Sequence, residues 1–294
     1  MIIKHNHPEA ATLAVQLGKY ILARGLSVIF AKESNTVAHT LQKETDKERR
    51  KKIILVDKPK MVDVADLIIV LGGDGTYLSI ARLMKDESVP VMGVNMGQLG
   101  FLTEIKKSEA FETLEQILTG IPPKISERAL LEVTLKRKNK VIFQGPVVND
   151  AVISKGAIAR IIGMHVSING QSVNTVRADG IIVSTPTGST AYSLAAGGPI
   201  IEPSIPAVIL TPIRAHSLTL RPLVVPDTSV IEICLTHRPG HVLLTLDGQD
   251  AVDMKEEDIV TVRRFKKHSL KLISSPTRDY FNLLREKLKF GHRG

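Results

Sequence analysis

A glycine-rich segment around one aspartate contains the residue types in this chain that are best suited to chemistry. The segment Leu71–Tyr77 (LGGDGTY) surrounds Asp74 with three glycines, and it follows an apolar run at residues 65–70 that is typical of a buried parallel strand. Residues 78–84 have the pattern of a starting helix. Glycines at a strand-to-helix junction leave backbone N–H groups free to face an anion. Asp74 itself would repel a phosphate, so it is suited to take a proton from a hydroxyl or to lie near a metal. The alternative is a tight turn in which Asp74 has only a structural role.

A second polar stretch, Arg177–Ser193, runs from an apolar strand pattern into a proline, a glycine and several hydroxyl residues. Hydroxyls and free amides before a short helix suit the phosphates of a nucleotide, and Tyr192 can stack on a ring. A serine- and threonine-rich turn explains the same pattern equally well. Asn149 and Asp150 pair an amide with a carboxylate, a combination suited to an amino-purine or a ribose diol. Taken alone, that pair fits a β-bulge or a turn better.

The first 120 residues or so alternate between helix and strand patterns, which must position the aspartate turn. We expect strands at residues 26–30, 53–56, 65–71 and 89–94, and helices that begin near Pro8 and at Ser108 and end at Gly25 and Gly120. The opening strand is reduced to residues 1–3, which predicts a short sheet edge. This alternation predicts an open parallel α/β sheet, in which ligands bind beyond the carboxyl ends of the strands. Both Leu71–Tyr77 and a second glycine-rich segment, residues 93–101, leave from those ends.

After Ile121-Pro122-Pro123 the pattern changes to short alternating strands. We expect them at residues 130–135, 147–153, 161–168, 230–235, 242–246, 259–262 and 270–273. Asn169-Gly170 between two of these runs predicts a two-residue hairpin. Many short strands separated by turn residues indicate an all-β, sandwich-like domain. The sequence therefore predicts an α/β domain over residues 1–123, a β-rich domain over 124–274, and a C-terminal helix within 275–294 that packs back on the α/β domain.

Length, charge and cysteine content limit the class of protein. The chain has 294 residues, 43% of them hydrophobic, which is enough for two domains with cores. No apolar run is long enough for a membrane span, the N-terminus lacks the pattern of a signal peptide, and the single cysteine excludes an internal disulfide. These features favour the cytoplasm and no membrane partner. The net charge is +9, but the basic clusters are scattered and aromatic residues make up only 4%, so we expect no nucleic-acid partner. A positive field would equally attract a small polyanionic substrate.

Four motifs, taken in order along the chain, resemble those of NAD kinases. They are Gly72-Gly73-Asp74-Gly75, Asn149-Asp150, the run from Asp179-Gly180 through Ser184-Thr185-Pro186-Thr187-Gly188-Ser189-Thr190-Ala191-Tyr192, and Asp247-Gly248-Gln249. The resemblance covers nearly the whole chain, because the length and the order of an α/β and then a β region also fit. The long STPTGSTAY run is highly specific, whereas a GGDG turn alone also resembles diacylglycerol kinases and phosphofructokinases. The family usually has Asn-Glu where this chain has Asn149-Asp150, so the carboxylate here reaches one methylene less far.

The resemblance implies phosphorylation of NAD at the 2′-hydroxyl of its adenosine ribose, giving NADP, with ATP or alternatively polyphosphate as the donor. Asp74 looks like the general base with Gly75 beside it, Asn149 and Asp150 resemble the pair that contacts adenosine, and Asp179 is similar to the residue at the nicotinamide end. The further NAD contacts implied by the resemblance are Arg160, Arg177, Thr190, Ala191, Tyr192, Ser193, Leu194, Ala195 and Gln249. The resemblance also implies a homodimer or homotetramer, in which the β-rich domain of a neighbouring subunit helps to complete each site.

The donor's phosphates are expected to bind through backbone amides and hydroxyls at the two turns. The residues expected to do so are Gly72, Gly73, Thr187, Gly188 and Ser189. Mg²⁺ or another divalent cation would bridge donor oxygens and keep most of its waters, so no dedicated metal site is expected in the protein. Two other classes fit parts of the pattern, namely a lipid or other small-molecule kinase on the same scaffold and a nucleotide- or nucleic-acid-binding module without catalysis. An apolar segment for an acyl chain would favour the first, and steeply salt-dependent binding would favour the second.

Overall fold

The computed structural model divides the chain into two units. Unit 1 is formed by Met1–Glu127 with Leu270–Gly294, and unit 2 by Arg128–Ser269. The structure describes residues 1–84, 89–156, 160–217, 219–237 and 240–289. Among these residues, no helix has both the length and the apolar character needed to cross a membrane.

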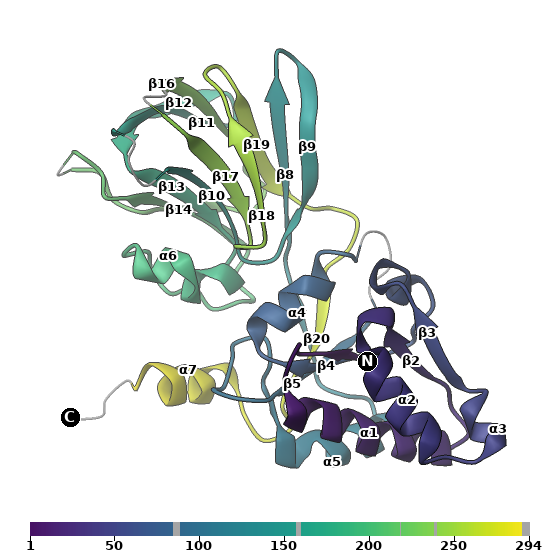
Figure 1. Cartoon of the computed structure of the whole chain (residues 1–294). Helices are drawn as coiled ribbons and strands as arrows, with labels where there is room; N and C mark the ends of the chain where they lie inside the picture. Colours follow the sequence, from purple (N-terminus) through teal and green to yellow (C-terminus); the bar gives the residue numbers. More distant parts are fainter. Residues whose placement is uncertain (85–88, 157–159, 218, 238–239, 290–294) are drawn as a thin grey trace. The chain divides into compact units, whose positions relative to one another are not determined.

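Unit 1 is built on a parallel sheet (Figure 1). Its strands pair in the order β1-β4-β5-β20-β7, and β6 also pairs with β5. A separate parallel pair is formed by β2 and β3. The strands are β1 (Ile2–Ile3), β2 (Val28–Ala31), β3 (Ile53–Val56), β4 (Ile68–Gly72), β5 (Val91–Asn95), β6 (Ile105–Lys106), β7 (Ile125–Arg128) and β20 (Leu270–Ile273). The pairs β1–β4, β4–β5, β5–β6 and β5–β20 are all parallel, which confirms the predicted α/β sheet.

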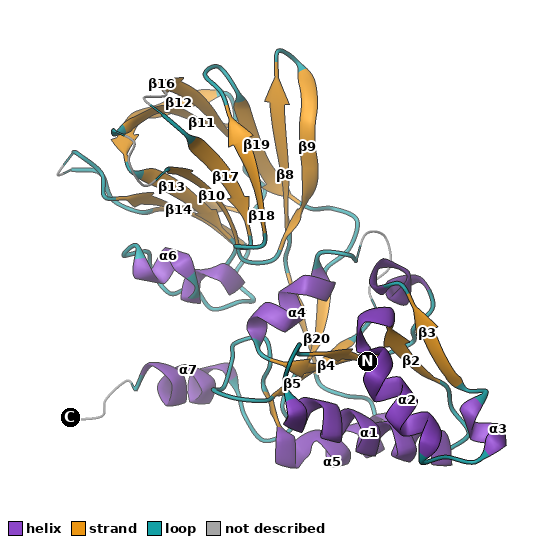
Figure 2. Cartoon of the chain, viewed as in Figure 1, coloured by secondary structure: helices purple, strands orange, loops and turns teal. Residues whose placement is uncertain are grey.

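Unit 1 also contains helices (Figure 2), and α1 and α5 bury apolar faces that the sequence pattern had indicated. They are α1 (Pro8–Ala23), α2 (Asn35–Lys43), α3 (Lys47–Arg50), α4 (Asp74–Ala81), α5 (Ala110–Leu118) and α7 (Tyr280–Leu288), with 3₁₀ turns at Lys32–Ser34, Lys58–Asp63 and Lys107–Glu109. α1 begins with Pro8 in its first turn, and the ring of His7 accepts the Ala10 N–H at 3.2 Å. Leu17 of α1, Leu71 of β4 and Leu114 of α5 belong to one buried cluster, which forms the core of unit 1.

The start of α5 differs from the prediction. Ser108 lies inside the 3₁₀ turn Lys107–Glu109 and does not cap the helix. The carboxylate of Glu109 instead accepts the Lys106 N–H at 2.8 Å. A serine before an apolar periodic run is a common cap, but a carboxylate one residue later competes for the same free amides.

The strand at residues 270–273 belongs to unit 1 and not to the β-rich region with which the sequence had grouped it. β20 pairs in parallel with β5, with Leu272 opposite Val91 and Ile273 opposite Met92. A four-residue apolar strand has the same pattern in either sheet, so its partner is decided by packing and not by its own residues. The chain thus returns to unit 1 before α7 begins.

Unit 2 consists of two six-stranded antiparallel sheets with the orders β15-β14-β13-β10-β17-β18 and β12-β11-β16-β19-β8-β9. The strands are β8 (Leu131–Arg137), β9 (Lys140–Val147), β10 (Asp150–Lys155), β11 (Ile162–Ile168), β12 (Gln171–Ala178), β13 (Gly180–Ser184), β14 (Ala207–Ile213), β15 (Leu223–Pro226), β16 (Ile231–His237), β17 (Val242–Leu246), β18 (Asp250–Met254) and β19 (Ile259–Arg264). A 3₁₀ turn (Thr187–Thr190) and the short helix α6 (Tyr192–Ala195) follow β13. Side chains of both sheets form one buried cluster, so the sheets pack face to face and confirm the sandwich-like domain.

Tight turns with positive φ angles connect neighbouring strands of unit 2. Asn169-Gly170 forms the predicted two-residue turn between β11 and β12, with φ angles of 52° and 75°. The connection between β17 and β18 has three residues, 247–249, and its Asp247 and Gly248 have φ angles of 49° and 64°.

The run at residues 147–153, which the sequence predicted as one strand, is two. β9 ends at Val147 and β10 begins at Asp150, and the two strands lie in different sheets. Val148 and Asn149 therefore form the crossing from one sheet to the other. A continuous apolar pattern does not reveal such a crossing, because residues on both sides of it face the same core.

The placement of β20 predicts a specific cost of truncating its central side chain. Leu272 is fully buried, so Leu272→Ala should lower the free energy of unfolding by about 2–5 kcal/mol. Lys271→Ala on the same strand is the matched control and should change it by less than about 0.5 kcal/mol. Urea denaturation measures both. Equal, small effects would show that β20 is not part of the core of unit 1.

Candidate active site

The GGDG turn joins β4 to α4 in unit 1. β4 ends at Gly72, Gly73 is the N-cap, and Asp74 is the first helical residue. The helix thus starts at the motif and not at Leu78. A carboxylate in the first turn is favoured by the helix dipole. A Cβ added at Gly73 or Gly75 would meet no atom within 4 Å, so a ligand can approach the backbone closely at both positions. The carboxylate between them is that of Asp74.

The carboxylate of Asp74 is bound by the loop that follows β5. Oδ2 accepts the Phe101 N–H at 2.8 Å. Oδ1 accepts the N–H groups of Leu102 and Thr103 at 3.0 and 3.1 Å and the Thr103 hydroxyl at 3.1 Å. These donors hold the carboxylate in one orientation and leave Oδ2 with the greater free accepting capacity. The second glycine-rich segment of the sequence therefore binds the first, which sequence reasoning did not foresee.

Gly100 makes this docking possible. A Cβ at position 100 would lie 1.9 Å from Oδ1 of Asp74, far inside contact distance. Gly97, in the same loop, would meet nothing within 4 Å. The requirement for glycine at residue 100 thus comes from the approach of Asp74.

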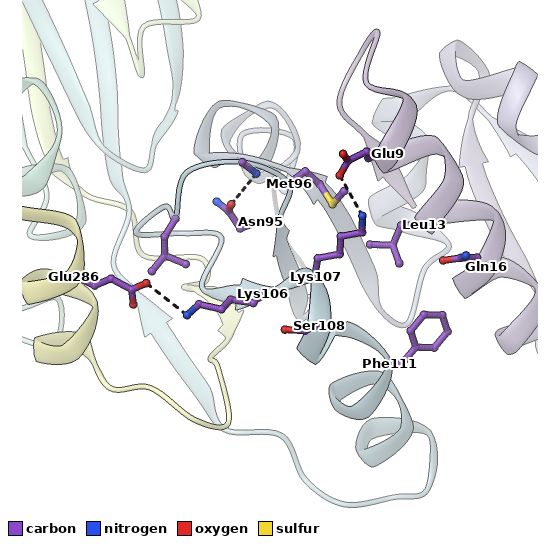
Figure 3. Close-up of a pocket in the computed structure, with 12 residues that line it drawn as sticks. Glu9, Leu13, Gln16, Asn95, Met96, Lys106, Lys107, Ser108, Phe111 and Glu286 are labelled. Atoms are coloured by element: carbon purple, nitrogen blue, oxygen red, sulfur yellow. Dashed lines mark hydrogen bonds and ion pairs between the residues drawn. The ribbon is translucent and has the colours of Figure 1, made fainter.

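Asn95 ties down the start of the same loop. Its side-chain amide donates to the Gln98 carbonyl at 2.7 Å and to the Thr103 hydroxyl at 3.1 Å, and its Oδ1 accepts the Gly97 N–H at 2.9 Å. Asn95 also lines a cavity of about 780 Å³ in unit 1 (Figure 3). The lysines of this cavity, Lys106 and Lys107, pair with Glu286 and Glu9 respectively, so their charges are neutralised. Asp74 is not among its lining residues, and we assign the cavity no catalytic role.

Lys287 is a further residue at Asp74 that the sequence did not indicate. Its Nζ lies 3.8 Å from Oδ2 of Asp74 and 4.5 Å from the centre of the Phe101 ring. The tail showed only helical spacing, which indicates the buried face of α7 and says nothing about what its polar residues contact.

In unit 2, a cavity of about 330 Å³ brings several predicted residues together. Asn149, Asp150, Ala191 and Tyr192 line it. The other lining residues, which had not been singled out as site residues, are Val152, Ser154, Thr245, Asp247 and Gly248. The Tyr192 ring is 47% exposed, so it is available to stack on a ligand.

Asp247 organises the sheet crossing that carries Asn149 and Asp150. Its carboxylate accepts the N–H groups of Val148, Asn149 and Asp150 at 2.9, 2.7 and 3.1 Å. These amides lie at or beside the crossing between the two sheets, and burying backbone amides without acceptors would cost free energy. The Asp247-Gly248 turn therefore does more than close a hairpin, because its side chain holds the predicted nucleotide-recognition pair in place.

The Asp150 carboxyl lies in an unusual electrostatic environment. Asp150 is 4% exposed, and burial, followed by the nearby charge of Asp247, raises its pKa from an ordinary value near 3.8 to about 7. Near neutral pH this carboxyl can therefore donate as well as accept a hydrogen bond. That dual capacity suits a ligand edge with both donors and acceptors.

The hydroxyl-rich turn after β13 is largely buried and satisfied by protein groups. The Gly188 N–H donates to the Thr185 hydroxyl at 3.0 Å, and the Ser189 hydroxyl donates to the Pro186 carbonyl at 2.6 Å. A Cβ at Gly188 would lie 2.1 Å from the Asn149 carbonyl oxygen. Thr187 is also buried. The Gly188 amide and the Ser189 hydroxyl therefore have partners within the protein, and the expectation that Thr187, Gly188 and Ser189 contact donor phosphates stays a prediction.

The remaining predicted residues do not line the unit 2 cavity. Arg160, Arg177 and Gln249 are exposed on the surface of unit 2. Asp179 forms an ion pair with Lys155 at 2.9 Å. Thr190 ends the 3₁₀ turn, and Leu194 and Ala195 lie in α6 with Tyr192, while Ala191 links the two elements. Ser193 is buried, and its hydroxyl is 2.8 Å from that of Thr211. In the part of the chain that the structure describes, no group of three or more His, Cys, Asp or Glu side chains is placed to hold a metal ion.

The shifted pKa of Asp150 predicts a pH-dependent stability. The folded chain keeps a proton that the unfolded chain releases between about pH 4 and 7, so the stability from this carboxyl is greatest below pH 4 and falls as the pH rises to about 7. Asp150→Asn is neutral throughout and should lack this fall. We expect the free energy of unfolding of the wild type, minus that of the variant, to decrease by up to about 1.4 kcal/mol per pH unit. Urea titrations at the two ends of the window test this, and a pH-independent difference would contradict it.

Comparisons with known proteins cover both units. The family model described as the ATP-NAD kinase N-terminal domain matches residues 1–121, and that of the ATP-NAD kinase C-terminal domain matches residues 148–275. The NAD kinase of Geotalea daltonii is 43% identical over 290 residues, covering 99% of this chain and 97% of that protein. The NAD kinase of Syntrophobacter fumaroxidans is 42% identical over 291 residues, covering 99% of this chain and 98% of that protein.

Solved structures of an NADH kinase and an NAD kinase also match this chain. Yeast NADH kinase complexed with NADH has a TM-score of 0.90 and 28% identity, and the match covers 99% of this chain and 87% of that one. An NAD kinase from Archaeoglobus fulgidus in complex with ATP has a TM-score of 0.67 and 24% identity, with 84% and 97% covered, and supports the fold alone. The matched family models and the nearly full-length relatives show that the chain belongs to the NAD kinase family.

Proposed function

We propose that this chain transfers the terminal phosphoryl group of ATP to the 2′-hydroxyl of the adenosine ribose of NAD, giving NADP and ADP. Its membership of the NAD kinase family supports this donor and acceptor, and the yeast relative with bound NADH supports a nicotinamide dinucleotide as ligand. The observation that carries the proposal is the Asp74 carboxylate, which donors from residues 101–103 hold in one orientation at the β4–α4 turn.

In the proposed reaction, Oδ2 of Asp74 accepts the proton of the 2′-hydroxyl as that oxygen attacks the terminal phosphorus. A bond forms between the phosphorus and the ribose oxygen. The bond from the phosphorus to the bridging oxygen of ADP breaks, and its electron pair leaves with ADP. Oδ2 is suited to this role because it accepts one amide, whereas Oδ1 accepts two amides and a hydroxyl. Phosphoryl transfer depends on alignment and charge neutralisation more than on covalent chemistry, so a fixed base in an open turn suffices.

We assign recognition of the NAD nucleotide to the unit 2 cavity. Asn149 offers an amide, Asp150 a carboxyl that can donate or accept, and Tyr192 an exposed ring. Asp150 is one methylene shorter than the glutamate usual in the family, and the carboxylate of Asp247 fixes its backbone. Gly75, Arg160, Arg177, Asp179, Gln249 and the segment 190–195 remain proposed NAD contacts on the strength of the resemblance. Thr187, Gly188 and Ser189 remain proposed contacts of the donor's phosphates on the strength of the resemblance.

We assign the donor's phosphates to the turn at Gly72 and Gly73 beside Asp74, where the backbone at Gly73 is open. The described residues offer no cluster of metal ligands, and Asp74 already accepts four protein hydrogen bonds. The residues therefore do not fit a resident cation, and we propose that a divalent cation enters as part of the Mg–ATP substrate. Polyphosphate is a proposed alternative donor. We also propose a homodimer or homotetramer, with the cytoplasm as its compartment.

The function is tested by incubating the purified chain with Mg–ATP and NAD and measuring NADP and ADP. Parallel reactions replace NAD with NADH or diacylglycerol, and ATP with polyphosphate. We expect NADP to form in a one-to-one ratio with ADP and no phosphorylated lipid. Phosphorylation of the lipid without formation of NADP would identify a lipid kinase on this scaffold instead.

Asp74→Asn tests the general base. The variant's side-chain oxygen can still accept amides from residues 101–103, so we expect normal folding by circular dichroism. It cannot accept the hydroxyl proton, so turnover should fall by roughly 10²- to 10⁴-fold. Turnover close to that of the wild type would remove Asp74 from the proton transfer.

Gly100→Ala tests whether the docking of Asp74 matters for turnover, with Gly97→Ala as the matched control in the same loop. The added methyl at residue 100 would overlap Oδ1 of Asp74 and should displace either the carboxylate or the loop, whereas the methyl at residue 97 meets open space. A displacement of about 1 Å at a reacting group costs on the order of 10²-fold in rate. We expect a loss of that size in turnover for Gly100→Ala and almost none for Gly97→Ala. Equal activities would show that Asp74 acts without this docking.

A further inference from the structure

The C-terminal helix α7 is anchored to unit 1 at both ends. At its start, the Asp279 carboxylate accepts the Asn282 N–H at 2.7 Å, and the preceding Arg278 forms an ion pair with Glu109 at 2.9 Å. The Tyr280 ring lies 6.5 Å from that of Phe101. Near its end, Glu286 pairs with Lys106 at 3.5 Å. Residues on the last turn of α7 therefore have a defined position relative to the loop at residues 101–103.

Lys287 uses that position to reach Asp74. Its Nζ is 3.8 Å from Oδ2 and 4.5 Å from the centre of the Phe101 ring, and its side chain is 34% exposed. Among the residues that the structure describes, it is the only cation within ion-pair distance of Asp74. Oδ2 is also the carboxylate oxygen with the greater remaining accepting capacity. The ammonium group therefore lies beside the oxygen at which the proposed proton transfer takes place.

An ion pair at this distance on a partly exposed surface contributes little to stability, so a stabilising role alone does not account for the placement. A cation at a phosphoryl-transfer centre, in contrast, stabilises charge on the equatorial oxygens of the transferred group. When Asp74 takes up the hydroxyl proton, its negative charge is lost. The ammonium of Lys287 then has no anionic partner among the residues that the structure describes, and it is available to the phosphoryl group.

We propose that Lys287 is a catalytic residue that binds the transferred phosphoryl group and, before transfer, orients the Asp74 carboxylate. This inference rests on the proposed function of Asp74. Lys287 changes partner from Oδ2 to a phosphoryl oxygen as the 2′-hydroxyl proton moves to Asp74. The C-terminal helix is thereby part of the transfer centre.

Lys287→Met, Lys287→Arg and Arg285→Met test the proposal in the full chain. Arg285→Met is the matched control, because it removes one positive charge from the same helix, where Arg285 donates to Asn282 of α7 itself. Steady-state kinetics with Mg–ATP and NAD give kcat and both KM values, and thermal unfolding gives Tm. For Lys287→Met we expect kcat to fall by at least about tenfold, with KM for NAD and Tm nearly unchanged. Lys287→Arg should recover most of the loss, and Arg285→Met should stay within about twofold of the wild type.

The possible outcomes separate this proposal from the function on which it rests. A wild-type chain that makes no NADP overturns the proposed function. With an active wild type, equal kcat values for Lys287→Met and Arg285→Met overturn the role of Lys287 and leave the role of Asp74 intact. A fall in kcat accompanied by a matching fall in Tm, or one that Lys287→Arg does not restore, would mean that the lysine only supports the fold, which also overturns the proposal.

Discussion

The hydrogen-bonding requirement of one carboxylate, that of Asp74, determines how the loops of unit 1 meet at the GGDG turn. A half-buried carboxylate is costly unless donors satisfy it, and consecutive backbone amides of residues 101–103 do so for Asp74. They can reach it because β4 and β5 are parallel neighbours, so the segments that leave their carboxyl ends meet at one edge of the sheet. The absence of a side chain at Gly100 then allows contact. The two glycine-rich segments are therefore two sides of a single interaction.

In unit 2 a carboxylate likewise accepts hydrogen bonds from consecutive backbone amides, here at the crossing between two sheets. Where the chain crosses from β9 to β10, the Asp247 carboxylate accepts three consecutive backbone amides. The left-handed turn that places Asp247 there depends on the small residue Gly248 beside it. This arrangement puts two carboxylates close together, and the resulting repulsion adds to burial in raising the pKa of Asp150. The carboxylate that satisfies the backbone amides thus also raises the pKa of a carboxyl that lines the unit 2 cavity.

Several elements show which structural features a sequence pattern predicts and which it does not. Asn169-Gly170 predicted its hairpin, because both positions require positive φ and few other residue pairs accept it. The run at 147–153 was predicted as one strand, and the strand at 270–273 was assigned to the wrong sheet, because apolar periodicity reports burial and not the partner. Thr187, Gly188 and Ser189 have the residue types of a phosphate-binding turn, yet their polar atoms are used by the protein itself. Residue type indicates what a group can do, and burial decides whether it is available.

The sequence by itself determined the two-part architecture, the position of Asp74 in an open glycine turn and membership of the NAD kinase family, since these follow from local periodicity and from motifs that are contiguous along the chain. Tertiary structure alone decided which groups meet. It brought Lys287, more than two hundred residues away in the chain, to Asp74, and it brought Asp247 to the amides of residues 148–150. The physical reason is that hydrogen bonds and ion pairs act over a few ångströms in space. Distance along the chain carries no information about such contacts until the sheets and the returning C-terminal helix are assembled.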